Sequence, residues 1–185
     1  RGDGDEPLTQ GTAIELLEGI VADQRTIIQD MTGEAPEKTP QVWALYKEVQ
    51  DYYDQGMTVP DDVTLLFADD NWGNIRRLPD PDAPERKGGY GVYYHFDYVG
   101  GPRSYKWINT NPLPRIWEQM NLAYQHRVET IWIVNVGDLK PMEFPMSFFL
   151  DLAWDPGIWQ AENIEEYHRL WAEQQFGKSH AKIIG

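Results

Sequence analysis

Short apolar runs alternate with amphipathic segments along most of the chain. Runs rich in β-branched and aromatic residues predict four strands, at residues 41–46, 63–68, 91–96 and 130–136. Apolar positions at helical spacing predict five helices, at residues 10–31, 48–55, 112–125, 145–153 and 164–177. The stretch QVWALYKEVQDYYDQG at residues 41–56 also fits one continuous helix, and we favour a short strand that leads into a helix.

The predicted strands are continuous apolar runs, which indicates strands that are buried on both faces of a parallel sheet. A doubly wound sheet and an eight-stranded barrel both satisfy this pattern. A glycine-rich phosphate loop would favour the doubly wound sheet, but GDGDEP places acids where a phosphate would have to lie. Because a whole barrel needs roughly 250 residues, we expect an α/β fold that forms about half of a (β/α)8 TIM barrel, roughly its C-terminal half, cut from a larger protein.

The domain organisation follows from this assignment. Residues 1–160 are expected to belong to the catalytic barrel, and residues 161–185 are expected to form a helix that leads out of the barrel toward a following domain. The chain has no internal repeat and no low-complexity linker.

Composition excludes several classes of function. A net charge of −14 and the lack of a basic patch argue against nucleic acid and anionic membranes as partners. No segment approaches the ~20 apolar residues of a membrane span. The absence of cysteine excludes disulfides and thiolate chemistry. The aromatic content of 13% supplies flat faces that either cover sugar rings or fill a large core.

Polar residues follow several predicted strands at the point where each strand ends. They are Lys47 and Glu48, then Asp69, Asp70 and Asn71, then His95 and Asp97, together with the opening RGDGDE, which we expect to follow a strand outside this sequence. The carboxyl ends of barrel strands form one face, where active sites lie. If Asp69 and Asp70 alternate across their strand end, one of them points to the barrel axis and meets Glu48, Asp5 and His95.

Clustered carboxylates raise one another's pKa values and so separate an acid from a base. With flanking aromatic residues and no phosphate loop, they suggest glycoside hydrolysis. Each acid alone is better explained as a helix cap or a solvated loop residue, and the placement of several acids after successive strands is what favours a site. A divalent cation at Asp3, Asp5, Asp69 and His95 is a second alternative, but DGDE lacks the Gly and Glu that a calcium loop needs, and we expect no metal and no cofactor.

Four segments, RGDGDEP, YKEVQDYY, LLFADDNWGNIRRLP and GVYYHFDYVGGPRSYKWINTNPLPRIWEQM, resemble in order the central catalytic region of glycoside hydrolase family 115, the xylan α-1,2-glucuronidases. The resemblance runs through nearly the whole chain and covers part of a family member. It implies a secreted or periplasmic multidomain enzyme, often dimeric, that removes glucuronic acid or its 4-O-methyl form from glucuronoxylan with inversion at the anomeric carbon.

The resemblance also implies site residues. The family's catalytic carboxylates match Asp5, Glu48 and Asp69, and its sugar-contacting positions match Arg1, Asn71 and His95. We expect Glu48 to protonate the leaving sugar oxygen while Asp5 or Asp69 activates the water.

The substrate's own carboxylate must be met by a cation in so acidic a chain. Arg1, Lys47, His95, Arg103 and Lys106 are the candidates, and Arg is preferred for its bidentate fork. We also count Asp70 among the substrate-binding residues.

Two rival functions stay open at this point. One is a non-catalytic carbohydrate-binding or scaffold module, which would use the aromatic residues but not several convergent carboxylates. The other is a retaining glycosidase, in which the carboxyl groups stand about 5–5.5 Å apart instead of the ~6.5–9.5 Å of an inverting enzyme. The expected partners are glucuronoxylan and, for the full-length protein, a second copy of itself.

Overall fold

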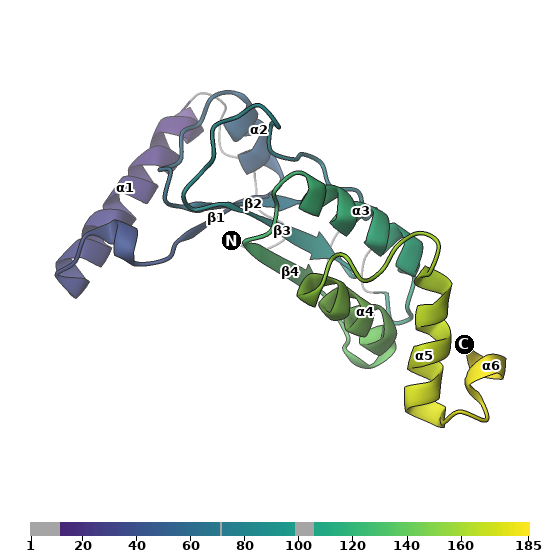
Figure 1. Ribbon diagram of the computed structural model, residues 1–185. Coiled ribbons are helices and arrows are strands. Elements are labelled where there is room, and N and C mark those ends of the chain that lie inside the picture. The colour runs from purple at the N-terminus through teal and green to yellow at the C-terminus, as the bar shows by residue number, and fades with distance from the viewer. Residues whose placement is uncertain (1–11, 71, 99–105) are drawn as a thin grey trace. The chain divides into compact units, whose positions relative to one another are not determined.

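A computed structural model describes residues 12–70, 72–98 and 106–185 of the chain (Figure 1). Its elements are α1 (Thr12–Thr32), η1 (Pro36–Lys38), β1 (Val42–Leu45), α2 (Glu48–Asp54), β2 (Thr64–Ala68), β3 (Tyr90–His95), α3 (Leu113–Gln125), β4 (Ile131–Asn135), η2 (Lys140–Met142), α4 (Glu143–Trp154), α5 (Ile164–Phe176) and α6 (Ala181–Ile184). Each predicted strand and helix is present, with its described ends within two residues of the prediction. The three short helices η1, η2 and α6 were not predicted.

The four strands form one sheet in the order β1-β2-β3-β4. β1 pairs with β2 in parallel through Val42 and Thr64, and β2 pairs with β3 in parallel through Leu65 and Tyr90. Hydrogen bonds from Thr130 N to Tyr90 O (3.0 Å) and from Phe96 N to Asn135 O (2.8 Å) continue the same direction into β4.

This strand order confirms the predicted α/β class with a parallel sheet. Strands that are neighbours in the sequence are also neighbours in the sheet (Figure 1), whereas a doubly wound sheet reverses its strand order at a switch point. The arrangement is consistent with part of an α/β barrel.

The chain divides into two compact units. The first contains residues 1–70, 75–94 and 126–133, and the second contains residues 71–74, 95–125 and 134–185. The last residue of β3 and the last two residues of β4 belong to the second unit. The separate predicted division at residue 160 stays a prediction.

The core of the first unit is built on the central strands. All five residues of β2 are buried, as expected for a parallel strand that is covered on both faces. Leu45, Leu65 and Val92 have no exposed surface, and the ring of Phe67 stacks on that of Tyr90 at 5.9 Å between centroids.

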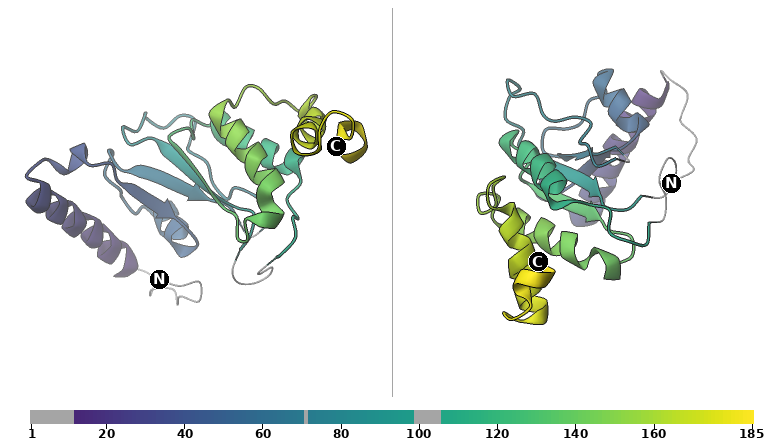
Figure 2. Two further views of the ribbon diagram at one scale, coloured as in Figure 1. Left: turned by 90° about the horizontal axis from the view of Figure 1, so that it is seen from below. Right: turned by 90° about the vertical axis from the view of Figure 1, so that its right-hand side faces the viewer.

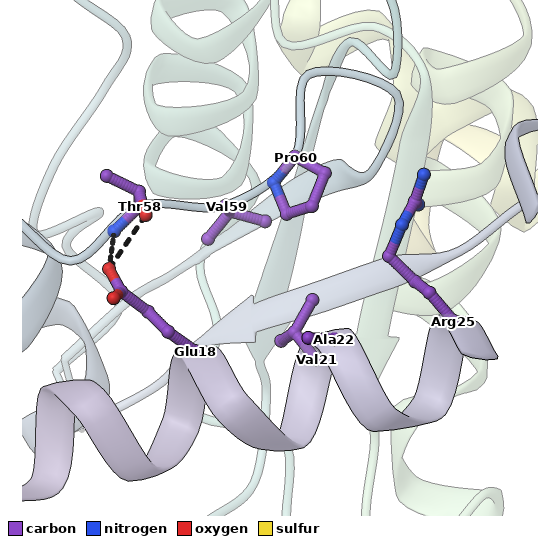
Figure 3. Close-up of a pocket in the computed structure, with 7 residues that line it drawn as sticks. All are labelled: Glu18, Val21, Ala22, Arg25, Thr58, Val59 and Pro60. Carbon is purple, nitrogen blue, oxygen red and sulfur yellow. Dashed lines mark hydrogen bonds between the residues drawn. The ribbon is translucent and has the colours of Figure 1, made fainter. Parts of the chain in front are cut away.

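Helix α1 contacts the rest of the first unit through polar side chains and buries few of its apolar side chains. It buries Ala13 and Val21, while Leu16, Ile20, Ile27 and Met31 are exposed. The carboxylate of Glu18 accepts hydrogen bonds from the backbone N (2.6 Å) and the Oγ1 (2.7 Å) of Thr58, at one end of the open pocket shown in Figure 3. These bonds from Thr58 lower the pKa of Glu18.

The core of the second unit is aromatic. Phe148 packs edge-on against Tyr167, with ring centroids 5.0 Å apart, and Phe149 packs edge-on against Phe96 at 6.0 Å. The hydroxyl of the buried Tyr167 donates to Asp151 Oδ2 (2.8 Å), and burial, together with this bond, raises the pKa of Tyr167. In the same unit α6 packs on α5 (Figure 2).

Candidate functional site

Two of the predicted catalytic carboxylates lie at the same edge of the sheet in the first unit. The last residue of β1, Leu45, pairs with Phe67 of β2. Glu48 is the first residue of α2, directly beyond β1, and Asp69 directly follows β2. Since β1 and β2 are parallel, their carboxyl ends bring both residues to one edge. Their catalytic roles stay predictions.

Asp69 is held by the chain on both sides of it. Its backbone N donates to Tyr93 O (3.3 Å), and an isolated antiparallel bridge pairs it with Ile75. The backbone N of Arg76 donates to Ala68 O (3.2 Å), so the chain turns after β2 and returns along the strand's end. Asp69 is only 3% exposed whereas Asp70 is half-buried, and this difference agrees with the predicted alternation of the two side chains.

Lys47 and Glu48 form the turn between β1 and α2. Lys47 has φ of 49° and ψ of −124°, a conformation that L-residues with a side chain rarely adopt. Its carbonyl accepts hydrogen bonds from Gln50 N (3.1 Å) and from Arg76 Nη1 (3.3 Å). Its ammonium lies 5.3 Å from the centroid of the Tyr46 ring, within cation-π range. Backbone strain of this kind clusters at functional sites.

The second unit holds His95 and Asp97 at the end of β3. His95 is 8% exposed, and its ring lies 5.0 Å from that of Tyr98. Asp97 is 6% exposed as a residue, and its Oδ1 accepts a hydrogen bond from the backbone N of Lys106 (3.2 Å). The Lys106 ammonium donates to Phe96 O (2.9 Å), so this candidate for binding the substrate's carboxylate also holds the strand end in place.

Four predicted site residues, Arg1, Asp5, Asn71 and Arg103, lie outside the described residues, as does Asp3 of the metal alternative. Within residues 12–70, 72–98 and 106–185, no cluster of three or more His, Cys, Asp or Glu side chains could hold a metal ion. Over the same part of the chain, no helix is both long and apolar enough to cross a membrane.

Two consecutive arginines after the aspartates bind α2, and the sequence pattern did not predict these contacts. Arg76 Nη2 donates to Asp51 Oδ1 (3.2 Å) on α2, in addition to the bond from Nη1 to the Lys47 carbonyl. Arg77 forms an ion pair with Asp54, and its guanidinium carbon lies 5.1 Å from the centroid of the Tyr53 ring. The visible signal was the pair RR directly after ADDNWGNI, in the same loop as the candidate site.

Comparison with known proteins gives a consistent result. The sequence model described as Glycosyl hydrolase family 115 matches residues 1–185. A solved structure described as a novel family GH115 4-O-methyl-α-glucuronidase, BtGH115A, with specificity for decorated arabinogalactans, superposes with a TM-score of 0.85 at 36% sequence identity. The match covers 100% of this chain and 25% of that chain. A search of curated proteins gave no match. The family model and the similar structure both cover the whole sequence, and the chain therefore belongs to glycosyl hydrolase family 115.

Proposed function

We propose that this chain forms part of the catalytic domain of an α-glucuronidase that removes glucuronic acid, or its 4-O-methyl form, from a plant polysaccharide. The observation that carries the proposal is the family match over the whole chain, combined with Glu48 and Asp69 at the same edge of the sheet. A binding or scaffold module does not require such carboxylates, whereas hydrolysis does, and we therefore favour the hydrolase.

The proposed chemistry is direct displacement by water with inversion. Glu48 donates a proton to the glycosidic oxygen as the bond from that oxygen to the anomeric carbon breaks. A water molecule attacks the anomeric carbon from the opposite face and gives its proton to Asp69 or Asp5. The products are β-glucuronic acid and the polysaccharide with a free hydroxyl where the glucuronic acid was attached. The base ends protonated and Glu48 ends ionised, so one proton exchange with solvent restores the enzyme.

The substrate is itself an anion, and the chain carries a net charge of −14. Local cations must therefore receive the sugar carboxylate. We assign this task to Arg1 and Arg103, with Lys47 as a further cation. Asn71, His95 and Asp70 are assigned to the sugar hydroxyls, which need both donors and acceptors.

Two polysaccharides are candidates for the substrate. Glucuronoxylan is the substrate that the sequence resemblance implies. The similar solved structure is described as specific for decorated arabinogalactans, and this description favours arabinogalactan side chains as the second candidate. We further propose that the full-length protein is secreted or periplasmic and forms a homodimer. Light scattering of the purified full-length protein would test the dimer.

Proton NMR of the reaction distinguishes these possibilities. The full-length protein is mixed in parallel with glucuronoxylan and with a glucuronic acid-decorated arabinogalactan, and the first anomeric signal of the released sugar is followed. β-Glucuronic acid that appears before mutarotation supports both the enzyme and its inverting course. An α product would mean a retaining mechanism, and no release from either polysaccharide would contradict the proposed hydrolase.

Replacing Glu48 with Gln tests the proposed acid. The amide keeps the size of the side chain but has no proton to give, so we expect kcat on a polysaccharide to fall by about 10²–10⁴-fold. Glu129→Gln is the control, because Glu129 is exposed and precedes the amino end of β4. An unchanged rate in a correctly folded Glu48→Gln protein would remove Glu48 from the mechanism.

A further inference from the structure

We propose that Arg76 is a positioning residue that holds Glu48 in a set place relative to Asp69. This inference rests on the proposed function, because it matters for catalysis only if these two carboxylates act on one substrate. Arg76 lies in the loop that follows Asp69, and its side chain reaches the turn that carries Glu48. It therefore links the two strand ends that carry Glu48 and Asp69.

The main chain of Arg76 is anchored to the end of β2. Its N donates to Ala68 O (3.2 Å), and the residue before it, Ile75, forms the antiparallel bridge with Asp69. The backbone of residues 75 and 76 is thus paired with the backbone of Ala68 and Asp69. A group that the Arg76 side chain binds is therefore fixed relative to the end of β2.

The guanidinium binds the first turn of α2 at two points. Nη1 donates to Lys47 O (3.3 Å), and Nη2 donates to Asp51 Oδ1 (3.2 Å). The Lys47 carbonyl belongs to the peptide group that connects Lys47 to Glu48, so a shift of this oxygen moves the Glu48 backbone. The planar fork of Arg satisfies two acceptors at once, which the single ammonium of Lys does not do as well.

The turn at residues 47 and 48 needs external support. A non-glycine residue in a sparsely populated backbone conformation costs about 1–3 kcal/mol and persists where the surroundings hold it. Helix α2 has seven residues, and its first turn is closed by bonds of the 3₁₀ type, Val49 N to Tyr46 O (3.1 Å) and Gln50 N to Lys47 O (3.1 Å). Helices this short are marginal by themselves.

The expected contribution to overall stability is small. The Arg76 side chain is 34% exposed and that of Asp51 is 56% exposed, and exposed pairs of this kind contribute about 0.2–1 kcal/mol. We therefore expect the fold to stay intact when Arg76 is replaced. Catalysis is more sensitive, since a misplacement of about 1 Å can lower a rate by about 10²-fold.

The next residue provides a matched control. Arg77 is also bound to α2, but through Asp54 and the Tyr53 ring, at the far end of the helix from Glu48. Replacing Arg77 with Met removes a similar cation and a similar pair without touching the Lys47 carbonyl.

The test compares Arg76→Met, Arg76→Lys and Arg77→Met in the full-length protein, on a glucuronosylated oligosaccharide and on a nitrophenyl α-glucuronide. Nitrophenolate leaves without protonation, so a misplaced acid should matter only for the oligosaccharide. We expect Arg76→Met to lower kcat about 10–100-fold on the oligosaccharide with KM nearly unchanged, and less than about 3-fold on the nitrophenyl glycoside. Arg76→Lys should lower kcat on the oligosaccharide less than Arg76→Met does. Arg77→Met should have the same kcat as the wild type.

A second readout does not depend on activity. Hydrogen exchange of peptides that cover residues 46–52 should be faster in Arg76→Met and unchanged in Arg77→Met, because the Val49 and Gln50 amides lose the support of the turn. Unchanged exchange, or equal loss of kcat on both substrates, would overturn the role of Arg76. A wild-type protein that cleaves neither substrate would instead overturn the proposed function, while the exchange result would still decide whether Arg76 holds the turn.

Discussion

Several buried polar atoms lack a hydrogen-bond partner among the described residues, which lowers the stability of the fold. Gln50 on α2 is 4% exposed, and its Oε1 has no hydrogen-bond donor among the described residues. The indole nitrogens of Trp43 and Trp159 are buried without an acceptor in the same part of the chain. A buried polar atom without a partner costs about 1–3 kcal/mol.

Replacing Gln50 with Met should therefore stabilise the protein. Met has a similar volume and no polar oxygen, so we expect the free energy of unfolding to rise by about 1 kcal/mol. Urea denaturation followed by tryptophan fluorescence measures the change. Gln24→Met, at an exposed position of α1, is the control and should have an effect below about 0.5 kcal/mol. A loss of stability in Gln50→Met would show that water or another group satisfies the oxygen.

Among the secondary structure elements, two glycines illustrate opposite requirements. Gly91 lies in β3, where a Cβ would come within 2.6 Å of Ile131 O and 2.9 Å of Leu66 Cδ1. The absence of a side chain thus permits the close approach of β3 to its neighbours in the sheet. Gly19 lies within α1, and a Cβ there would meet no atom within 4 Å.

The two alanine substitutions should consequently change stability in opposite directions. Gly91→Ala forces the sheet apart and should lower the free energy of unfolding by about 1–3 kcal/mol. Gly19→Ala should raise it by about 0.5–1 kcal/mol, because alanine loses less conformational entropy in a helix. Parallel thermal melts of both variants would measure the pair. Equal destabilisation by both would mean that α1 packs against a surface at Gly19 that the described residues do not include.

At the scale of the whole molecule, long-range ion pairs connect distant parts of this acidic chain. Arg25 of α1 binds Asp62 (2.7 Å), 37 residues away, before β2, and also Glu37 (2.8 Å). Burial by itself would raise the pKa of Asp62. The hydrogen bonds that Asp62 accepts from Arg25 and a backbone amide, together with the charges of Arg25 and Arg86, outweigh burial and leave this pKa lowered.

The direction of this shift predicts how stability changes with pH. A carboxylate whose pKa is lowered by folding stabilises the protein above its unfolded pKa of about 3.9, and this contribution is lost as the pH falls through the lower pKa of the folded state. Thermal melts between about pH 6 and pH 2.5 should therefore show a smaller acid-induced loss in Asp62→Asn than in the wild type. The neighbouring exposed Asp61→Asn is the control. Parallel curves for the wild type and Asp62→Asn would rule out this role for the pair.

Much of the fold and part of the site were predictable from local patterns. Strands β1 to β4 are short apolar runs between turn signals, and the helices repeat apolar residues at their own period, so their positions depend on neighbours in the sequence. The placement of Glu48 and Asp69 at one edge followed from parallel strand ends alone. The left-handed backbone of Lys47 and the link made by Arg76 carried no comparable signal.

The sequence by itself determined the element types, the α/β class and the positions of the candidate carboxylates along the chain, because these follow from periodicity and residue type. Only the tertiary structure decided that Ile75 pairs with Asp69, that Arg76 reaches the carbonyl of Lys47, 29 residues away, and that Lys47 adopts a positive φ. The physical reason is that these features depend on contacts between residues that only the folded chain brings together.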